Sequence, residues 1–159
     1  MMAREILFKA KRIDTGEWVE GYLFKKYYQE LPHDRFAIQY KTTGDENEWT
    51  PKYMAVEIDE STLCQYTGLT DKNGNKIWEN DVLDADEVNS LVRFDEENAR
   101  FVLDDYGIKG CLMEYGFDEN AGGYGFIETN GFDDFMDITE AVEVIGNIFD
   151  NPELLGGGE

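Results

Sequence analysis

The side chains that most often carry out chemistry are few and scattered in this sequence. Its single histidine, His33, follows a proline and has no cysteine close to it in the sequence. Its two serines, Ser61 and Ser90, lack the G-x-S-x-G surroundings of a hydrolase nucleophile. Nucleophilic catalysis and metal binding both need clustered residues. The sequence therefore predicts no catalytic residue, no metal site and no bound cofactor.

Acidic side chains are the one abundant chemical group. The chain has 35 Asp and Glu against 14 Lys and Arg, a net charge of −21. Residues 1–60 have nine basic and twelve acidic side chains, a net of −3, whereas residues 61–159 have five and 23, a net of −18. A region with that charge repels phosphate backbones, so we expect no direct binding of nucleic acid.

Two acidic clusters stand out in the second half, and neither matches the spacing of a calcium-binding loop. They are Asp84, Asp86 and Glu87, followed by Asp133 and Asp134. A solvated surface is the ordinary interpretation of such clusters. An acidic face could also imitate nucleic acid and occupy the basic groove of a host DNA- or RNA-binding protein. An enzyme that uses carboxylates or a bound metal ion is a third alternative.

The sequence shows no targeting or membrane segment. Its first residues form no apolar signal region, and no apolar run approaches the roughly 20 residues needed to cross a bilayer. Cys64 and Cys111 form no C-x-x-C motif, so buried free thiols are the ordinary interpretation, with a disulfide or a reactive thiol as alternatives. We therefore expect a protein of the cytoplasm.

Apolar residues alternate with polar ones along the first half, which is typical of strands. Residues 5–12 and 17–24 predict an antiparallel hairpin, and residues 36–40 and 54–58 predict two further strands. Asp59 or Ser61 can cap a single helical turn at residues 59–62. The first half is therefore expected to form a small antiparallel β domain.

Short strands at the spacing of a small barrel continue through the second half. Asn73-Gly74 predicts a type I′ turn, because both residues tolerate positive φ. We expect strands at residues 76–79, 82–83, 91–94, 101–103, 111–115 and 126–129, polar turns at 84–90 and 95–99, a Gly-rich loop at 120–125, and a short helix at 132–136. Residues 141–149 are the most apolar segment and predict a central strand that ends before Pro152.

Four aromatic residues fall in expected loops or at strand ends: Tyr27, Tyr28, Trp49 and Tyr53. Exposed aromatic side chains are typical anchors of protein interfaces. The alternative is that these rings fold back onto the domain. Because the first half has the smaller net charge, it is the better place for subunits to meet.

Six segments of the chain form a distinctive set: Arg4–Arg12, Gly16–Tyr22, Gln65–Leu69, Asp71–Gly74, Trp78–Leu83 and Val144–Leu155. In this order they resemble the YopX-like family of bacteriophage and prophage proteins. Their family-type residues are Gln65, Tyr66, Thr67, Gly68, Asn73, Gly74, Asp81, Gly146, Asn147 and Pro152. Asn80 stands where the family has glycine, and asparagine is the next-best residue for a left-handed corner.

The resemblance implies an SH3-like β-barrel in the C-terminal half, and it implies self-association. We therefore expect a mainly β protein with only short helical turns. Residues 1–68 would form the antiparallel domain, residues 69–155 the SH3-like barrel, and residues 156–159 a flexible tail. The expected function is that of a non-enzymatic phage or prophage accessory protein. It would form homo-oligomers and bind a host or phage protein in the bacterial cytoplasm.

Overall fold

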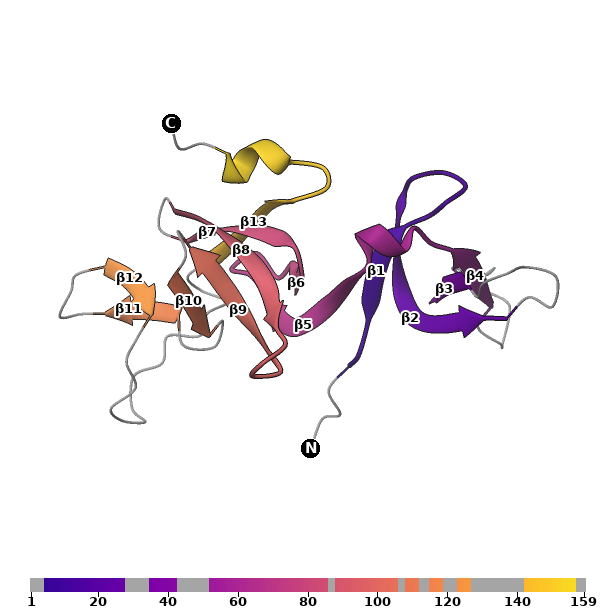
Figure 1. Ribbon diagram of the computed structural model, residues 1–159, viewed down its shortest axis with the longest axis horizontal. Coiled ribbons are helices and arrows are strands. Elements are labelled where there is room, and N and C mark those ends of the chain that lie inside the picture. Colours follow the sequence, from indigo (N-terminus) through magenta and orange to yellow (C-terminus); the bar gives the residue numbers. More distant parts are fainter. Residues whose placement is uncertain are drawn as a thin grey trace. The chain divides into compact units, whose positions relative to one another are not determined.

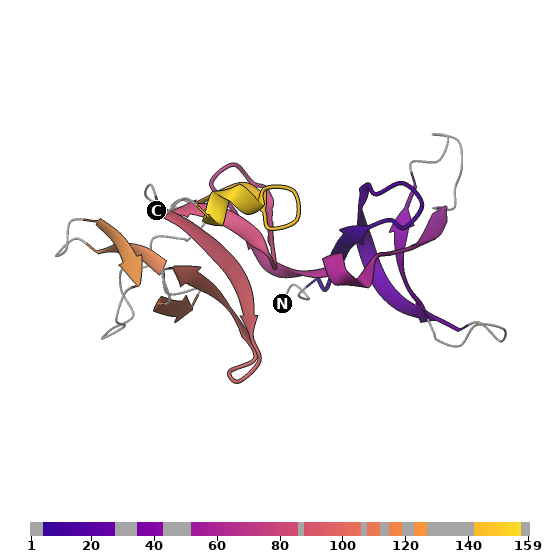
Figure 2. The ribbon, with the colours of Figure 1, turned by 45° about the horizontal axis from the view of Figure 1, so that its top comes forward.

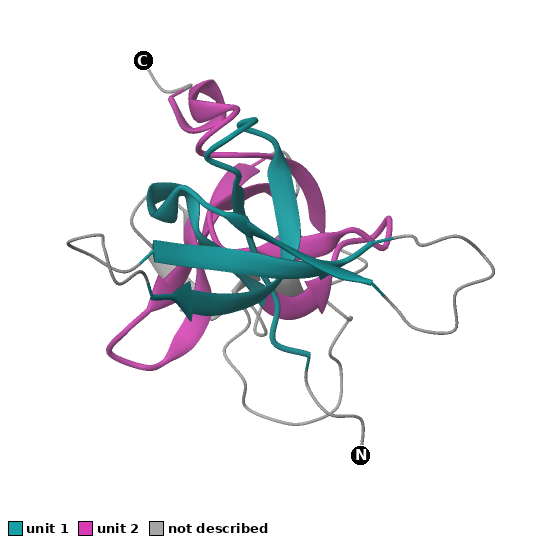
Figure 3. Ribbon diagram, turned by 90° about the vertical axis from the view of Figure 1, so that its right-hand side faces the viewer, with its two compact units in different colours: residues 1–66 teal, residues 67–159 magenta. Residues whose placement is uncertain are grey.

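The computed structural model describes residues 5–27, 35–42, 52–85, 88–105, 108–111, 115–118, 123–126 and 142–156. The chain divides into two compact units, residues 1–66 and 67–159 (Figure 3). Antiparallel strands dominate both units, and the described residues contain no helical element besides two short 3-10 turns. The predicted mainly β class is therefore confirmed, whereas the domain assignment as residues 1–68 and 69–155 stays a prediction.

The first unit is a curled antiparallel sheet in which neighbouring strands follow the order β4-β3-β2-β1-β5 (Figure 1). The bounds of its elements are β1 (Phe8–Lys11), β2 (Trp18–Lys26), β3 (Arg35–Lys41), β4 (Tyr53–Glu57), the 3-10 turn η1 (Glu60–Thr62) and β5 (Cys64–Thr70), which continues into the second unit. The predicted hairpin, the two further strands and the helical turn are confirmed. The side chain of Asp59 caps η1 by accepting a hydrogen bond from the Ser61 N–H at 3.0 Å.

Period-two alternation places one face of this sheet in a core. Ala10, Val19, Ile38 and Ile58 are its buried members, and Leu23 packs against them. The sheet curls so that the end of β4 meets the end of β1, where the Ile13 N–H donates to the Glu57 carbonyl at 3.1 Å. The contacts between β4 and β1 are confined to this end, so the described strands of the first unit form no closed barrel.

The second unit contains a five-stranded sheet in the order β10-β9-β8-β7-β13, with β6 paired to β5 and a separate β11–β12 hairpin (Figures 1 and 2). The bounds are β6 (Lys76–Trp78), β7 (Asp81–Ala85), β8 (Val88–Asp95), β9 (Arg100–Asp105), β10 (Ile108–Cys111), β11 (Tyr115–Asp118), β12 (Gly123–Phe126), β13 (Val142–Asn147) and the 3-10 turn η3 (Pro152–Leu155). Its core contains Ile77, Leu83, Val92, Phe101, Leu103 and Val142.

Three predictions for the second unit are wrong in detail. The polar turn expected at 84–90 is shorter, because β7 and β8 pair as far as Ala85 and Val88. The end of the expected Gly-rich loop is strand β12, which pairs with β11. In the described part of the sheet, β13 is an end strand and not a central one. The helix expected at 132–136 lies outside the described residues.

The turn expected at residues 95–99 is confirmed by the hairpin that joins β8 and β9. In this hairpin Phe94 and Phe101 face each other across the strands, with their ring centroids 5.1 Å apart in an edge-to-face arrangement. The described strands of the second unit form no closed barrel. The SH3-like barrel therefore stays a prediction.

Candidate functional site

The turn between β5 and β6 comprises Asp71–Asn75, and its three central residues, Lys72–Gly74, include one left-handed residue. The Gly74 N–H donates to the Asp71 carbonyl at 2.9 Å, and the Asp71 N–H donates to the Asn75 carbonyl at 2.8 Å. Gly74 has a φ of +81°, whereas Asn73 is not among the residues with positive φ. The predicted type I′ turn is therefore wrong, because that type needs positive φ at two adjacent residues. The observed geometry is a type I turn closed by a glycine bulge.

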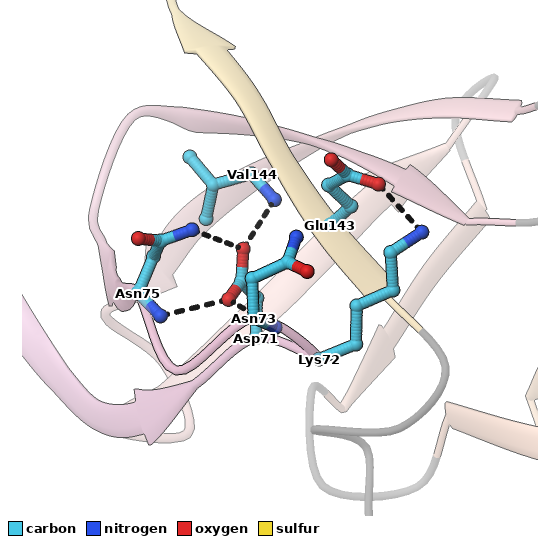
Figure 4. Close-up of polar contacts among 6 residues, drawn as sticks. All are labelled: Asp71, Lys72, Asn73, Asn75, Glu143 and Val144. Atoms are coloured by element: carbon cyan, nitrogen blue, oxygen red, sulfur yellow. Dashed lines mark hydrogen bonds and ion pairs between the residues drawn. The ribbon is translucent and has the colours of Figure 1, made fainter.

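The carboxylate of Asp71 is the polar centre of this turn (Figure 4). One oxygen accepts hydrogen bonds from the backbone N–H groups of Asn73 and Asn75 at 2.9 and 2.8 Å. The other accepts from the Asn75 side-chain amide at 3.1 Å and from the Val144 N–H of β13 at 3.0 Å. The Lys72 N–H also donates to the Val142 carbonyl at 3.0 Å. The turn therefore covers the outer edge of β13.

Burial and hydrogen bonding act in opposite directions on this carboxylate. Asp71 is only 2% exposed, and burial alone would raise its pKa. The hydrogen bonds from Val144, Asn75 and Asn73 outweigh that effect, so the pKa of Asp71 lies below its usual value. At neutral pH the group is a buried carboxylate with all four contacts already made. Such a group holds structure together and is not available as an acid or a base.

This lowered pKa predicts a loss of stability in acid. Because the pKa of Asp71 is lower in the folded than in the unfolded chain, its contribution is complete above the unfolded value of about 3.9. That contribution is lost as the pH falls through the folded value. Urea unfolding followed by Trp78 fluorescence, in a Trp18→Phe/Trp49→Phe background, measures it. The stability difference between this protein and its Asp71→Asn variant should shrink as the pH falls below about 4. A constant difference would contradict the assignment.

A second corner follows at Trp78–Asp81. Asp81 is 1% exposed, and its carboxylate accepts a hydrogen bond from the Trp78 N–H at 2.8 Å. Asn80 has a φ of +66°, so the left-handed corner predicted from its place in the family motif is present. Its backbone N–H donates to the Val92 carbonyl at 2.8 Å, and its carbonyl accepts from the Ile148 N–H at 3.1 Å. The corner therefore joins β8 to the end of β13.

The C-terminal motif residues form the turn that follows β13. The Asn147 side-chain carbonyl accepts from the N–H groups of Phe149 and Asp150, both at 3.0 Å. A Cβ on Gly146 would lie 2.5 Å from Oδ1 of Asn151 and 2.8 Å from a methyl group of Leu154, so a larger residue there would displace these two side chains. Pro152 begins η3, which is tied to the sheet by a hydrogen bond from the Asn89 side chain to the Leu154 carbonyl at 2.9 Å.

The Q-Y-T-G segment also has backbone roles. Gln65 pairs with Phe8 of β1, and the Tyr66 N–H donates to the Leu7 carbonyl at 2.9 Å. The buried Thr67 hydroxyl donates to the Ile77 carbonyl at 2.8 Å, and Gly68 has a φ of +89°. The described contacts of the family-type residues therefore explain the fold of these turns. Among these contacts, none exposes a reactive side chain to solvent.

The structure places two of the four predicted interface aromatics on the surface and does not bring them together. Tyr27 is 76% exposed and Tyr53 is 52% exposed. Tyr27 follows the Lys26–Arg35 pair at one end of β3, whereas Tyr53 pairs with Lys41 at the other end. Six residues of extended chain separate these ends, about 20 Å. Tyr28 and Trp49 lie outside the described residues.

Five exposed apolar side chains of the first unit were not predicted from the sequence: Ile6, Ile13, Tyr22, Phe24 and Met54. Tyr22 and Phe24 are 52% and 38% exposed on the outer face of β2, and Met54 is 52% exposed on β4. The charged residues Glu20 and Lys26 share the face of Tyr22 and Phe24, since they alternate in step along β2. The two charged residues in the same period-two series were the signal in the sequence that could have identified this face as solvent-exposed.

Of the predicted acidic surface, only Asp84 is described. It lies in β7 opposite Asn89 and is half-buried. Asp86, Glu87, Asp133 and Asp134 lie outside the described residues, as does His33, so a continuous acidic face stays a prediction. Within the described ranges, no group of three or more His, Cys, Asp or Glu side chains is placed to hold a metal ion.

The two cysteines differ in what the structure shows. Cys64 is a buried free thiol, as predicted, and its sulfur lies 3.3 Å from the Thr62 carbonyl oxygen. The Cys111 side chain lies outside the described part of the chain. Among the described residues, no helix has the length and apolar composition needed to cross a membrane.

Comparison with known proteins identifies the family on the basis of nearly the whole chain. The family model described as YopX protein matches residues 7–156. No curated protein matches the chain. The family match extends over parts of both units, from the first hairpin to η3, and includes the segments on which the resemblance rested except for residues 4–6. The chain belongs to the YopX protein family.

Proposed function

We propose that this protein is a non-enzymatic, self-associating protein-interaction module, and that it serves a phage or prophage in the cytoplasm of a bacterial host. The observation that carries the proposal is the group of exposed apolar side chains on the first unit. Tyr22 and Phe24 lie on the outer face of β2, and Tyr53 and Met54 lie on β4. Aromatic and methionine side chains are enriched in protein interfaces.

Charge supports the first unit as the place of contact. Its outer sheet face includes Lys9, Lys11, Lys26, Arg35 and Lys41 against Glu20 and Glu57, by the register of the paired strands. Lys26 and Arg35 both pair with Glu57, at 3.6 and 3.0 Å. Residues 61–159, by contrast, have five basic and 23 acidic side chains. Two copies therefore meet with least repulsion through their first units.

Self-association through apolar contacts predicts an unusual response to salt. Each copy carries a net charge of −21, so the copies repel one another at low ionic strength. Raising the salt from about 50 mM to about 500 mM shortens the Debye length from about 14 Å to about 4 Å and screens that repulsion. Sedimentation velocity at several protein concentrations should therefore show tighter association at high salt. A protein that stays monomeric at every concentration and both salt levels would overturn the proposal.

The acidic decoy is the second candidate, and the net charge of −18 on residues 61–159 is the observation that favours it. Its response to salt has the opposite sign. A complex between this acidic region and a basic nucleic-acid-binding protein would dissociate as salt rises, because the opposite charges are screened. The same salt series, applied to protein bound to purified host nucleic-acid-binding proteins, separates the decoy from the interaction module.

A further inference from the structure

Strand β4 is an end strand of the sheet in the first unit, and part of its outer backbone edge has no partner among the described residues. The Thr42 N–H donates to the Lys52 carbonyl, and the Ile58 N–H donates to the Phe36 carbonyl. Even-numbered residues of this segment therefore bond to β3, and the backbone groups of odd-numbered residues point away from it. The Glu57 carbonyl already accepts the Ile13 N–H, but no described residue pairs with the outward groups of Tyr53 and Ala55.

The side chains along this edge do not block pairing with another strand. Natural end strands are commonly blocked by charges, prolines or bulges. Tyr53, Met54 and Ala55 are uncharged and exposed, and their strand pairs with β3 without a register shift. Tyr53 and Met54 are each 52% exposed. The edge thus offers two N–H donors and two carbonyl acceptors beside an apolar surface.

The edge is complementary to itself. In an antiparallel pair of two β4 strands related by a two-fold axis at Met54, Tyr53 of one copy stands opposite Ala55 of the other. The outward N–H and C=O groups of both residues then form four hydrogen bonds. The large Tyr53 side chain lies beside the small Ala55 on one face. The two Met54 side chains meet on the other face, at the close spacing of a pair without mutual hydrogen bonds.

We propose that two copies of this chain associate through antiparallel pairing of their β4 strands, with Met54 opposite Met54 of the second copy. The inference rests on the proposed function, because it names the surface through which the protein self-associates. A second copy suits the edge for three reasons. One two-fold axis pairs every outward backbone donor with an acceptor. It also places the large Tyr53 beside the small Ala55, and it brings no like charges together, because the Tyr53–Ala55 segment is uncharged. Such a closed two-fold contact joins the first units of the two copies into one continuous sheet.

A charge-swap experiment tests the pairing. In Met54→Lys or Met54→Glu protein, two like charges would face each other, so the mass of the assembly in sedimentation should fall to half that of the unmodified protein. An equimolar mixture of the two variants should regain the full mass, because Lys then faces Glu. That recovery also shows that both variants are folded. Two variants that each keep the full mass would overturn the β4 pairing but leave self-association standing. An unmodified protein that is always monomeric would overturn both.

Disulfide trapping tests the register. Residues opposite each other in such a pair have Cα atoms about 4.5 Å apart, within the range of about 4.4–6.8 Å that a disulfide spans. Met54→Cys protein should therefore form a covalent dimer on mild oxidation with diamide. Tyr53→Cys is the matched control, since Tyr53 and its counterpart are diagonal neighbours about 7–8 Å apart. The unmodified protein, treated in parallel, accounts for Cys64 and Cys111. A dimer that forms faster with Tyr53→Cys than with Met54→Cys would overturn this register.

Discussion

Replacing Asp71 with alanine is expected to lower the free energy of unfolding of the second unit by about 2–4 kcal/mol. The substitution removes the acceptor for the backbone N–H groups of Asn73, Asn75 and Val144. Val144 is half-buried on β13, so water replaces the lost partner there only incompletely. The turn and the strand that it covers should therefore lose order together.

Hydrogen exchange measures this effect in the second unit directly. The amides of β7 and β8 include the buried residues Val82 and Val92, and they should exchange about one and a half to three orders of magnitude faster in Asp71→Ala protein. Asn73→Ala is the matched control. Asn73 contributes its backbone N–H to Asp71, and that group survives the substitution. Equal exchange rates in the two variants would show that the carboxylate does not hold the turn.

The elements that were predicted correctly are those whose conformation is determined by residues close together in the sequence. Alternation located β1 to β4, and Asp59 was recognised as a cap for η1. The corner at Asn80 was predicted because asparagine tolerates a left-handed backbone, and its φ of +66° agrees. In each case one residue type has a direct steric or hydrogen-bonding reason to be there.

The errors fall where the outcome depends on residues distant in sequence. Asp84 looked like part of a polar turn, but it continues β7 because Asn89 pairs with it across the hairpin. Gly123 and Gly125 have no side chains that could reveal the alternation of β12. Asn73-Gly74 fits two turn types by local preference. The chain takes the one in which Asp71 reaches Val144, 73 residues away in the sequence.

The candidate interaction surface was the hardest feature to predict. Exposure was one of two interpretations of Tyr53 at a strand end, the other being that its ring folds back onto the domain, and it is 52% exposed. Its neighbour Met54 lies on the same side of the sheet as the core residues Ile38 and Val56, yet it remains open because it lies beyond the core. Periodicity assigns a residue to a face but does not show how far a core extends along a strand.

Replacing Gly21 with alanine is expected to destabilise the first unit by about 3 kcal/mol, at the upper end of the cost of overpacking. A Cβ at this position would lie 2.1 Å from the Gln39 carbonyl oxygen and 3.0 Å from a methyl group of Ile38. The nearest atom belongs to the backbone of β3. A side-chain rotation therefore cannot relieve the contact, and β2 and β3 have to separate.

The expected consequence is faster hydrogen exchange in β2 and β3, by about two orders of magnitude. The amides of β7 and β8 in the same sample show whether the effect stays within the first unit. Gly16→Asn is the matched control, because Gly16 has a φ of +73° and no atom within 4 Å of an added Cβ. Asparagine tolerates that backbone better than most residues, so the control should cost about 1 kcal/mol or less, below the penalty of about 1–2 kcal/mol for an ordinary left-handed residue. Unchanged exchange in Gly21→Ala protein would contradict the close approach of β2 and β3.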